Sequence, residues 1–179
     1  MWERRKPLGS DFARRWNQRG AGVADGAPRP RVLVEDAEVA RVFTAACRLE
    51  DNGYAVSWCP GPTGPPGRRC PLVECGHCAL VDRADVVVSS LDLRHDSARR
   101  VVAAFRHLHH DTPLVIRAPS ETLDRWAPVF EGTWGGTRMS GAGDGLLETV
   151  GAALTAPAAA SGRAPVVLVP GAGPRPGAG

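Results

Sequence analysis

Residues 31–56 read RVLVEDAEVARVFTAACRLEDNGYAV, and this stretch decides the fold. It opens with a short, continuous apolar run, Arg31–Glu35, which is typical of a strand buried on both faces. From Asp36, the expected N-cap, to Asn52, apolar residues recur at helical spacing. Tyr54–Trp58 is the next expected strand. A buried strand, an amphipathic helix and a second buried strand predict a βαβ unit with a parallel sheet.

The same alternation continues along the chain. It predicts further strands at residues 85–89, 112–117 and 133–139, and helices at residues 97–109, 120–130 and 144–154. Strands that alternate with helices form a sheet covered on both faces. The sequence therefore predicts one α/β domain over residues 31–154, with a five-stranded doubly wound parallel sheet in a three-layer αβα, flavodoxin-like arrangement.

The two ends of the chain differ in composition from this domain. Residues 1–30 carry seven Arg or Lys against three Asp or Glu and show no sustained periodicity, which predicts a disordered basic arm. Residues 155–179 are rich in Ala, Pro and Gly, which predicts a disordered tail. Its one apolar patch, Val166–Val169, is expected either to add an edge strand or to be exposed.

The composition of the 179 residues excludes several classes of protein. With 43% hydrophobic and 23% charged residues the chain is typical of globular proteins, and it has no run near the ~20 apolar residues of a membrane span. We expect no membrane partner and, because no apolar stretch follows the charged N-terminus, a cytoplasmic location. A protein partner of unknown identity is expected. The basic arm leaves nucleic acid as an alternative partner, through phosphate contacts.

Residues 31–56, together with ADVVVSS (84–90) and DTPLVIRAPSE (111–121), resemble the receiver domain of response regulators. The resemblance implies a fold of the CheY-like type, and with it a pocket for Mg²⁺ and a phosphorylated aspartate. Glu35 and Asp36 occupy the positions of the acidic pair. The phosphoacceptor position falls on Ser90, with Asp92 two residues beyond.

The chain departs from the receiver pattern at the groups that handle the phosphoryl group. The Thr or Ser position falls on Ala118 and the Lys position falls near Met139, and Lys6 is the only lysine of the chain. Carboxylates without a cationic partner would repel phosphate. We therefore expect a pseudo-receiver that has lost its switch, with a vestigial acidic pocket at Glu35, Asp36, Ser90 and Asp92 and without bound Mg²⁺.

A cysteine-rich segment at residues 59–84 replaces the helix expected between the second and third strands. Four of the five cysteines lie in it, at positions 59, 70, 75 and 78. Thiolates are soft ligands that suit zinc or an iron–sulfur cluster, and Cys75–Cys78 has the two-residue spacing of a metal knuckle. Cys59, Cys70, Cys75 and Cys78 are the candidate ligands.

Two other interpretations of these cysteines stay open. They could act as a thiol–disulfide switch, or they could be incidental buried thiols. The tetrapeptide CGHC (75–78) resembles the active site of thiol–disulfide oxidoreductases, but Glu74 stands where that family has an aromatic residue.

No catalytic triad or nucleophile elbow is apparent in the sequence, and we expect that the protein is not an enzyme.

These observations lead to one functional hypothesis and one alternative. The hypothesis is a non-enzymatic regulatory or protein-interaction module whose cysteine cluster binds zinc or an iron–sulfur centre, or acts as a redox switch. The alternative is a phosphoaccepting signalling domain that uses Asp92 with Glu35 and Asp36.

Overall fold

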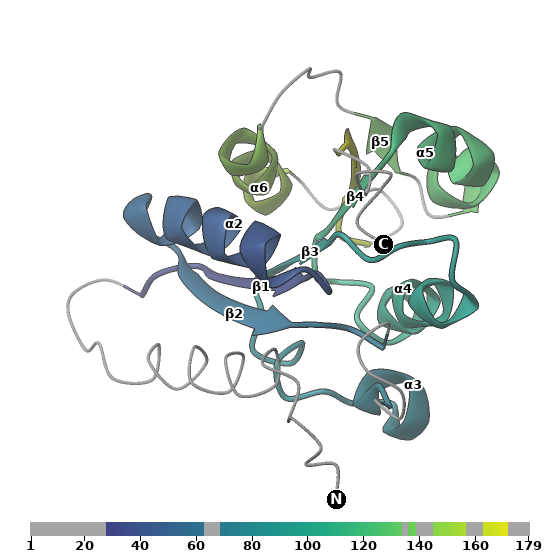
Figure 1. Ribbon diagram of the computed structural model, residues 1–179, viewed down its shortest axis with the longest axis horizontal. Coiled ribbons are helices and arrows are strands. Elements are labelled where there is room, and N and C mark those ends of the chain that lie inside the picture. Colours follow the sequence, from purple (N-terminus) through teal and green to yellow (C-terminus); the bar gives the residue numbers. More distant parts are fainter. Residues whose placement is uncertain (1–27, 63–68, 134–135, 139–144, 157–162, 172–179) are drawn as a thin grey trace, which may run out of the picture.

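The computed structural model describes residues 28–62, 69–133, 136–138, 145–156 and 163–171 (Figure 1). The predicted basic arm therefore lies almost entirely outside the described residues, and so does most of the predicted tail. Within the described ranges no helix has the length and apolar character needed to cross a membrane.

The first βαβ unit forms as predicted. Strand β1 (Arg31–Glu35) leads into helix α2 (Val39–Asp51) and strand β2 (Ala55–Cys59), which pairs in parallel with β1. Helix α2 buries Val42, Ala45, Ala46 and Leu49 against the sheet. Val39 and Phe43, two of the apolar residues at helical spacing, are exposed instead.

The remaining elements continue the alternation of strand and helix. They are α3 (Pro71–Cys75), β3 (Val86–Ser89), α4 (Asp96–Leu108), β4 (Leu114–Ala118), α5 (Ser120–Ala127), the wide helical segment η1 (Pro128–Thr133), β5 (Thr137–Arg138), α6 (Leu146–Thr155) and β6 (Val166–Pro170). The five-residue helix α3 stands where a doubly wound fold has its second full-length helix.

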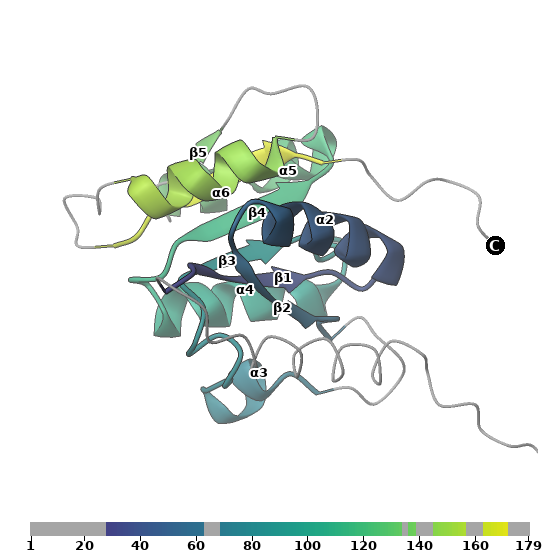
Figure 2. The ribbon, with the colours of Figure 1, turned by 90° about the vertical axis from the view of Figure 1, so that its left-hand side faces the viewer.

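The strands form one sheet in the order β2-β1-β3-β4-β6-β5, and every pair is parallel. Two separate cores lie on the two faces of the sheet, as expected for three layers (Figures 1 and 2). One core contains residues of α2 and α6, and the other contains residues of α3, α4, α5 and η1. The first five strands of this order reproduce the predicted five-stranded doubly wound sheet.

The fifth of these strands is not the one that the sequence predicted. Among the described residues of 133–139, Thr137 and Arg138 form the two-residue edge strand β5, while Val166–Pro170 forms β6 between β4 and β5. Val166, Val167, Leu168 and Val169 are all buried. The apolar patch beyond residue 154 is thus an internal strand, and the domain extends to Pro170 instead of ending at Leu154.

The order of the strands determines where a ligand would bind. Strand β1 lies between β2 and β3, so the chain leaves β1 toward one side and returns on the other. Doubly wound sheets bind ligands in the crevice outside the carboxyl ends of the strands at such a point. The residues that follow β1 and β3 are therefore the first place to look for a site.

Candidate functional site

Two cavities adjoin the carboxyl end of β1. The first, of about 440 Å³, lies outside the ends of β1, β3 and β4, and we call it the edge crevice; Asp36, Ser90, Asp92 and Arg117 are among its lining residues. The second, of about 260 Å³, lies between the sheet and α3, and we call it the cysteine cavity; Glu35, Cys59, Cys70 and Cys78 are among its lining residues.

The predicted acidic pair is divided between these two cavities. Successive residues of an extended chain point to opposite sides. Glu35 follows the direction of Leu33 into the cysteine cavity, whereas Asp36 lines the edge crevice. Both residues are buried, at 5% and 3% exposure. The structure therefore does not form the predicted pocket of Glu35, Asp36, Ser90 and Asp92, because Glu35 is not among the residues of the edge crevice.

The carboxylate of Asp36 is held by an arginine of the following helix. Arg41 donates two hydrogen bonds to it, from Nε to Oδ2 at 2.9 Å and from Nη2 to Oδ1 at 2.8 Å. The backbone N–H of Glu38 donates a third, at 2.8 Å to Oδ1. Asp36 was expected to be the N-cap of the helix, but α2 begins later, with Glu38 as its N-cap. Its carboxylate instead anchors Arg41.

Ser90 and Asp92 follow β3 on the opposite side of the edge crevice. The backbone N–H of Ser90 donates to the carbonyl of Glu35 at 2.7 Å, which extends the pairing of β1 with β3. The carboxylate of Asp92 accepts three hydrogen bonds from the Arg94 guanidinium, the shortest at 2.6 Å, and lies 3.6 Å from Nε2 of His95. These hydrogen bonds lower the pKa of Asp92, so the group is ionised and paired.

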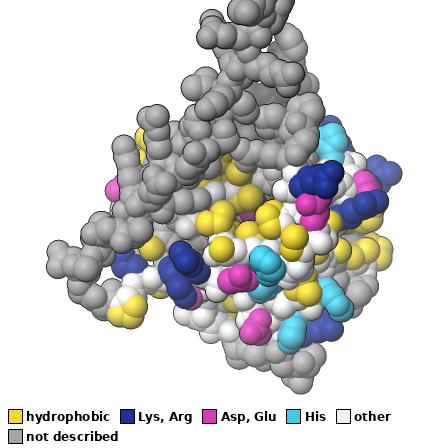
Figure 3. All heavy atoms as spheres, turned by 90° about the horizontal axis from the view of Figure 1, so that it is seen from below, with side chains coloured by type: hydrophobic (Ala, Val, Ile, Leu, Met, Phe, Trp, Pro, Cys, Tyr) yellow, Lys and Arg dark blue, Asp and Glu magenta, His cyan; other side chains and the backbone are white. Residues whose placement is uncertain are grey.

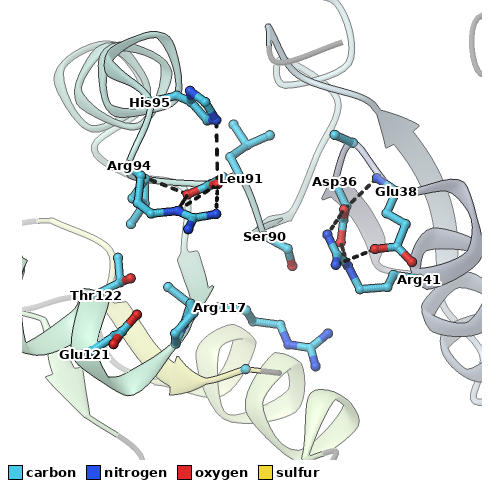
Figure 4. A pocket seen from close by; sticks show the side chains of 16 residues that line it. Asp36, Glu38, Arg41, Ser90, Leu91, Arg94, His95, Arg117, Glu121 and Thr122 are labelled. Carbon is cyan, nitrogen blue, oxygen red and sulfur yellow. Dashed lines mark hydrogen bonds and ion pairs between the residues drawn. The ribbon is translucent and has the colours of Figure 1, made fainter. Parts of the chain in front are cut away.

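The edge crevice thus contains carboxylates and cations in comparable number. Figure 4 shows two groups separated by Ser90, one formed by Asp36, Glu38 and Arg41 and the other by Arg94 and His95. Arg41 also pairs with Glu38, so one guanidinium serves two carboxylates. The sequence analysis missed Arg41 and Arg94, although each follows its aspartate by only a few residues. Their presence leaves the two aspartates engaged within the protein.

The cysteine cavity brings together three of the four predicted ligands. Cys59 comes from the end of β2, Cys70 precedes α3, and Cys78 follows it. All three are half-buried and pack against the core that includes Leu33 and Leu72. Among the described residues, no three His, Cys, Asp or Glu side chains are arranged to hold a single metal ion.

Burial controls the ionisation of the groups in this cavity. It raises the pKa of Glu35 to about 7, and the nearby Ser89 hydroxyl opposes that rise without reaching hydrogen-bond geometry. Burial also raises the pKa of Cys59 to about 12, and the charges of Glu35, Cys78 and Cys70 contribute to that rise. The pKa of Cys70 is raised for the same first reason. Cys59 is therefore a neutral thiol at physiological pH.

Cys75, the fourth predicted ligand, is not among the residues that line the cysteine cavity. It is the last residue of α3 and is exposed, and it does not line the cysteine cavity. Gly76 follows with a left-handed backbone (φ +75°), which ends the helix, and the chain reaches the cavity again at Cys78. The two-residue spacing of Cys75 and Cys78 thus spans a helix end, and of these two cysteines only Cys78 lines the cysteine cavity.

The surface on the side of α3 carries charges of both signs. In the view from that side, basic, acidic and histidine side chains are interspersed with hydrophobic ones (Figure 3). A surface that binds nucleic acid presents Lys and Arg toward the phosphates. The visible described atoms of this face do not form such a basic patch.

Comparison with known proteins adds little beyond the fold. No protein-family pattern matches the sequence, and no curated protein has significant sequence similarity to it. Among solved structures, the fold is similar to a signal receiver domain of an HD domain-containing protein from Pseudomonas fluorescens Pf-5. That similarity covers 63% of this chain and 76% of the other, with 18% identity and a TM-score of 0.44. The assignment to the receiver-like, flavodoxin-like architecture rests on the strand order and layers described above.

Proposed function

We propose that this protein is a non-enzymatic regulatory or protein-interaction module, built on a receiver-like scaffold and controlled from its cysteine cavity instead of by phosphorylation in its edge crevice. The observation that carries the proposal is the bidentate pairing of Asp36 with Arg41, together with a serine at position 90. We expect the module to act in the cytoplasm on a protein partner.

The first part of the proposal concerns the edge crevice. A phosphoryl switch of the receiver type needs free carboxylates for Mg²⁺ and an accessible aspartate for the phosphoryl group. Asp36 is buried and accepts three hydrogen bonds, so a cation could bind it only by displacing Arg41. That displacement would break a charge-assisted bidentate pair. The pairing therefore favours a structural role for Asp36.

The second part concerns the segment that contains the cysteines. Residues 69–84 include only the short helix α3, and they meet α4 through buried Leu72 and through Asp82, whose carboxylate lies 3.7 Å from Nε2 of His109. A metal centre or a bond between thiols at Cys59, Cys70 and Cys78 would tie this segment to β2. Such a tie offsets the entropy of ordering a long loop. The surface over α3 and α4 would then change with the state of the cavity. We expect a protein partner to bind this surface in one state and not in the other.

The alternative function is phosphorylation on Asp92. It is favoured by the place of Asp92, which lies just after β3 in the edge crevice with a side chain that is 30% exposed. It is opposed by Arg94, which already neutralises this carboxylate and donates hydrogen bonds to both of its oxygens. We therefore rank it second.

Labelling of the full chain with acetyl phosphate or phosphoramidate in the presence of Mg²⁺ tests the two functions against each other. We expect no aspartyl phosphate by mass spectrometry of rapidly quenched protein. Asp92→Asn is the matched control, since it removes the alternative acceptor and leaves the side-chain volume unchanged. A label on the wild type that is lost in Asp92→Asn would overturn the proposal and establish the alternative.

A further inference from the structure

The cysteine cavity has features that its part in the proposed function does not yet explain. Glu35 is buried in it, and no arginine, lysine or histidine in the described part of the chain forms an ion pair with its carboxyl group. The only arginine among the lining residues, Arg69, is largely exposed and lies 3.5 Å from Glu74. A buried carboxyl group and three thiols thus share one space, and no described residue forms an ion pair with that carboxyl group.

The lining of the cavity favours a soft, positively charged group. Leu33, Leu72, Pro71 and Val81 supply apolar walls, and the lining also contains the carboxyl group of Glu35, three cysteine sulfurs and Arg69. Thiolates select soft and borderline metals. A carboxylate without a counter-charge adds attraction for a cation in a region where water screens little. Alkali ions and hydrophobic ligands would leave either the sulfurs or the carboxylate unused.

The size of the cavity favours a cluster over one ion. No three of these side chains are arranged around a point that a single ion could occupy. The cavity nevertheless measures about 260 Å³, far more than one ion fills. A [4Fe–4S] cluster binds each of its four protein ligands through a different iron atom, so these ligands lie further apart than the ligands of a single ion. Iron–sulfur clusters are held mainly by cysteine thiolates and also accept other side chains as ligands.

One backbone contact already serves a sulfur of this set. The N–H of Gly61 donates to Sγ of Cys59 at 3.4 Å, and hydrogen bonds to the sulfurs are among the features that tune iron–sulfur centres. Gly61 adopts a left-handed backbone (φ +67°), and a Cβ at this position would collide with the side chain of Leu91. Both features require glycine at a residue that lines the cavity.

We propose that the cysteine cavity is an iron–sulfur cluster site, with the thiolates of Cys59, Cys70 and Cys78 and the carboxylate of Glu35 as its ligands and with Cys75 outside the set. This inference rests on the proposed function, because it names the group that controls the module. On binding, each thiol releases its proton to solvent and its sulfur bonds to an iron atom. The iron supplies the positive charge that the buried ligands lack.

Anaerobic reconstitution of the full reduced chain with iron and sulfide tests this inference. After removal of unbound iron we expect a brown protein that retains iron and acid-labile sulfide in similar amounts, with visible absorption. Cys59→Ser, Cys70→Ser and Cys78→Ser should each retain about tenfold less iron. Cys75→Ser and Cys47→Ser are the matched controls and should retain the wild-type amount. Glu35→Gln should retain less iron than the wild type.

Two kinds of result would overturn the inference. The first is a reduced, folded chain that stays colourless after reconstitution or retains only zinc. The second is a loss of iron in Cys75→Ser equal to that in Cys78→Ser. Far-UV circular dichroism of each variant identifies a failure to fold, and Cys78→Ser carries the test if Cys59→Ser unfolds, because Cys78 lies outside every strand. Absence of a cluster without phosphorylation would end this inference alone, whereas aspartyl phosphate would end the proposed function.

Discussion

The edge crevice and the cysteine cavity each contain one of two adjacent buried carboxylates, Asp36 and Glu35. The two carboxylates differ in whether a cation is paired with them. Asp36 in the crevice is buried and paired, with Arg41 on both of its oxygens. Glu35 in the cavity is equally buried and forms no ion pair with a described residue, and its pKa rises to about 7. A paired site is complete within the protein, whereas an unpaired one stores an unfavourable charge that a ligand can relieve. This difference is the reason why we propose that the functional centre lies in the cavity.

The largest effect on stability is expected when the charge of Glu35 is removed. A carboxyl group whose folded pKa lies above its unfolded value binds its proton more tightly in the folded state. The free energy of unfolding therefore falls as pH rises from about 4.5 to about 7, and it stays low above pH 7. Glu35→Gln should raise the free energy of unfolding of the metal-free, reduced protein at pH 8 by on the order of 2–3 kcal/mol. Urea denaturation at pH 5 and pH 8 measures this, and the variant should lose most of the pH dependence.

The corresponding change at Asp36 should act in the opposite direction. Asp36→Asn leaves Arg41 with a neutral partner and weakens three hydrogen bonds. Because Arg41 is partly exposed and can turn to water, we expect a loss of about 1–3 kcal/mol at pH 8. The double variant Asp36→Asn with Arg41→Met should lose less than the sum of the single variants. Additive losses would mean that the pair does not stabilise the crevice.

A smaller effect is expected at Asp92, on the far side of the same crevice. Its folded pKa is lowered, chiefly by hydrogen bonds from Arg94, so its contribution to stability is present above the unfolded pKa and is lost as pH falls through the folded pKa. The pair is partly exposed, and Asp92→Asn should cost below about 1 kcal/mol at pH 7. Chemical denaturation at pH 7 checks this, and a loss as large as that of Asp36→Asn would contradict it.

The smallest expected effect on stability concerns Cys75. It is exposed, so Cys75→Ser should leave the free energy of unfolding within about 0.5 kcal/mol of the wild type. The same substitution should abolish the fast phase when the native, metal-free protein reacts with a thiol reagent. Cys59 should react slowly, because it is half-buried and its pKa is about 12. A fast phase that persists in Cys75→Ser would show that another cysteine is accessible to the reagent.

Much of the fold could be predicted because strands buried on both faces leave a clear apolar signature. The βαβ units around β1, β3 and β4 follow from such runs. Strand β6 has the same signature in Val166–Val169, but the Ala, Pro and Gly residues around it suggested a tail. What places it in the sheet is the unpaired edge of β4, with which it aligns from Leu114 to Ala118. Such long-range pairing is not encoded in the local pattern.

The candidate site could be predicted only in part, for a similar reason. The cysteine-rich segment was identified from its composition, and three of its four cysteines do line one cavity. Sequence spacing placed Cys75 with Cys78, but the helix ends between them at Gly76 and only Cys78 lines the cavity. The resemblance to receiver domains grouped Glu35 with Asp36. The alternation of side chains along β1 was the signal that could have divided them.

An NMR titration of the Glu35 side-chain carboxyl carbon tests whether this residue belongs to the cysteine cavity. The titration uses metal-free, reduced protein, and Asp36→Asn is measured in parallel. If Glu35 belongs to the cysteine cavity, its midpoint lies near pH 7 and changes little in Asp36→Asn. A midpoint near 4.5, or one that moves strongly with the charge of Asp36, would mean that both carboxylates lie in a single acidic pocket. That result would contradict the assignment of Glu35 to the cysteine cavity.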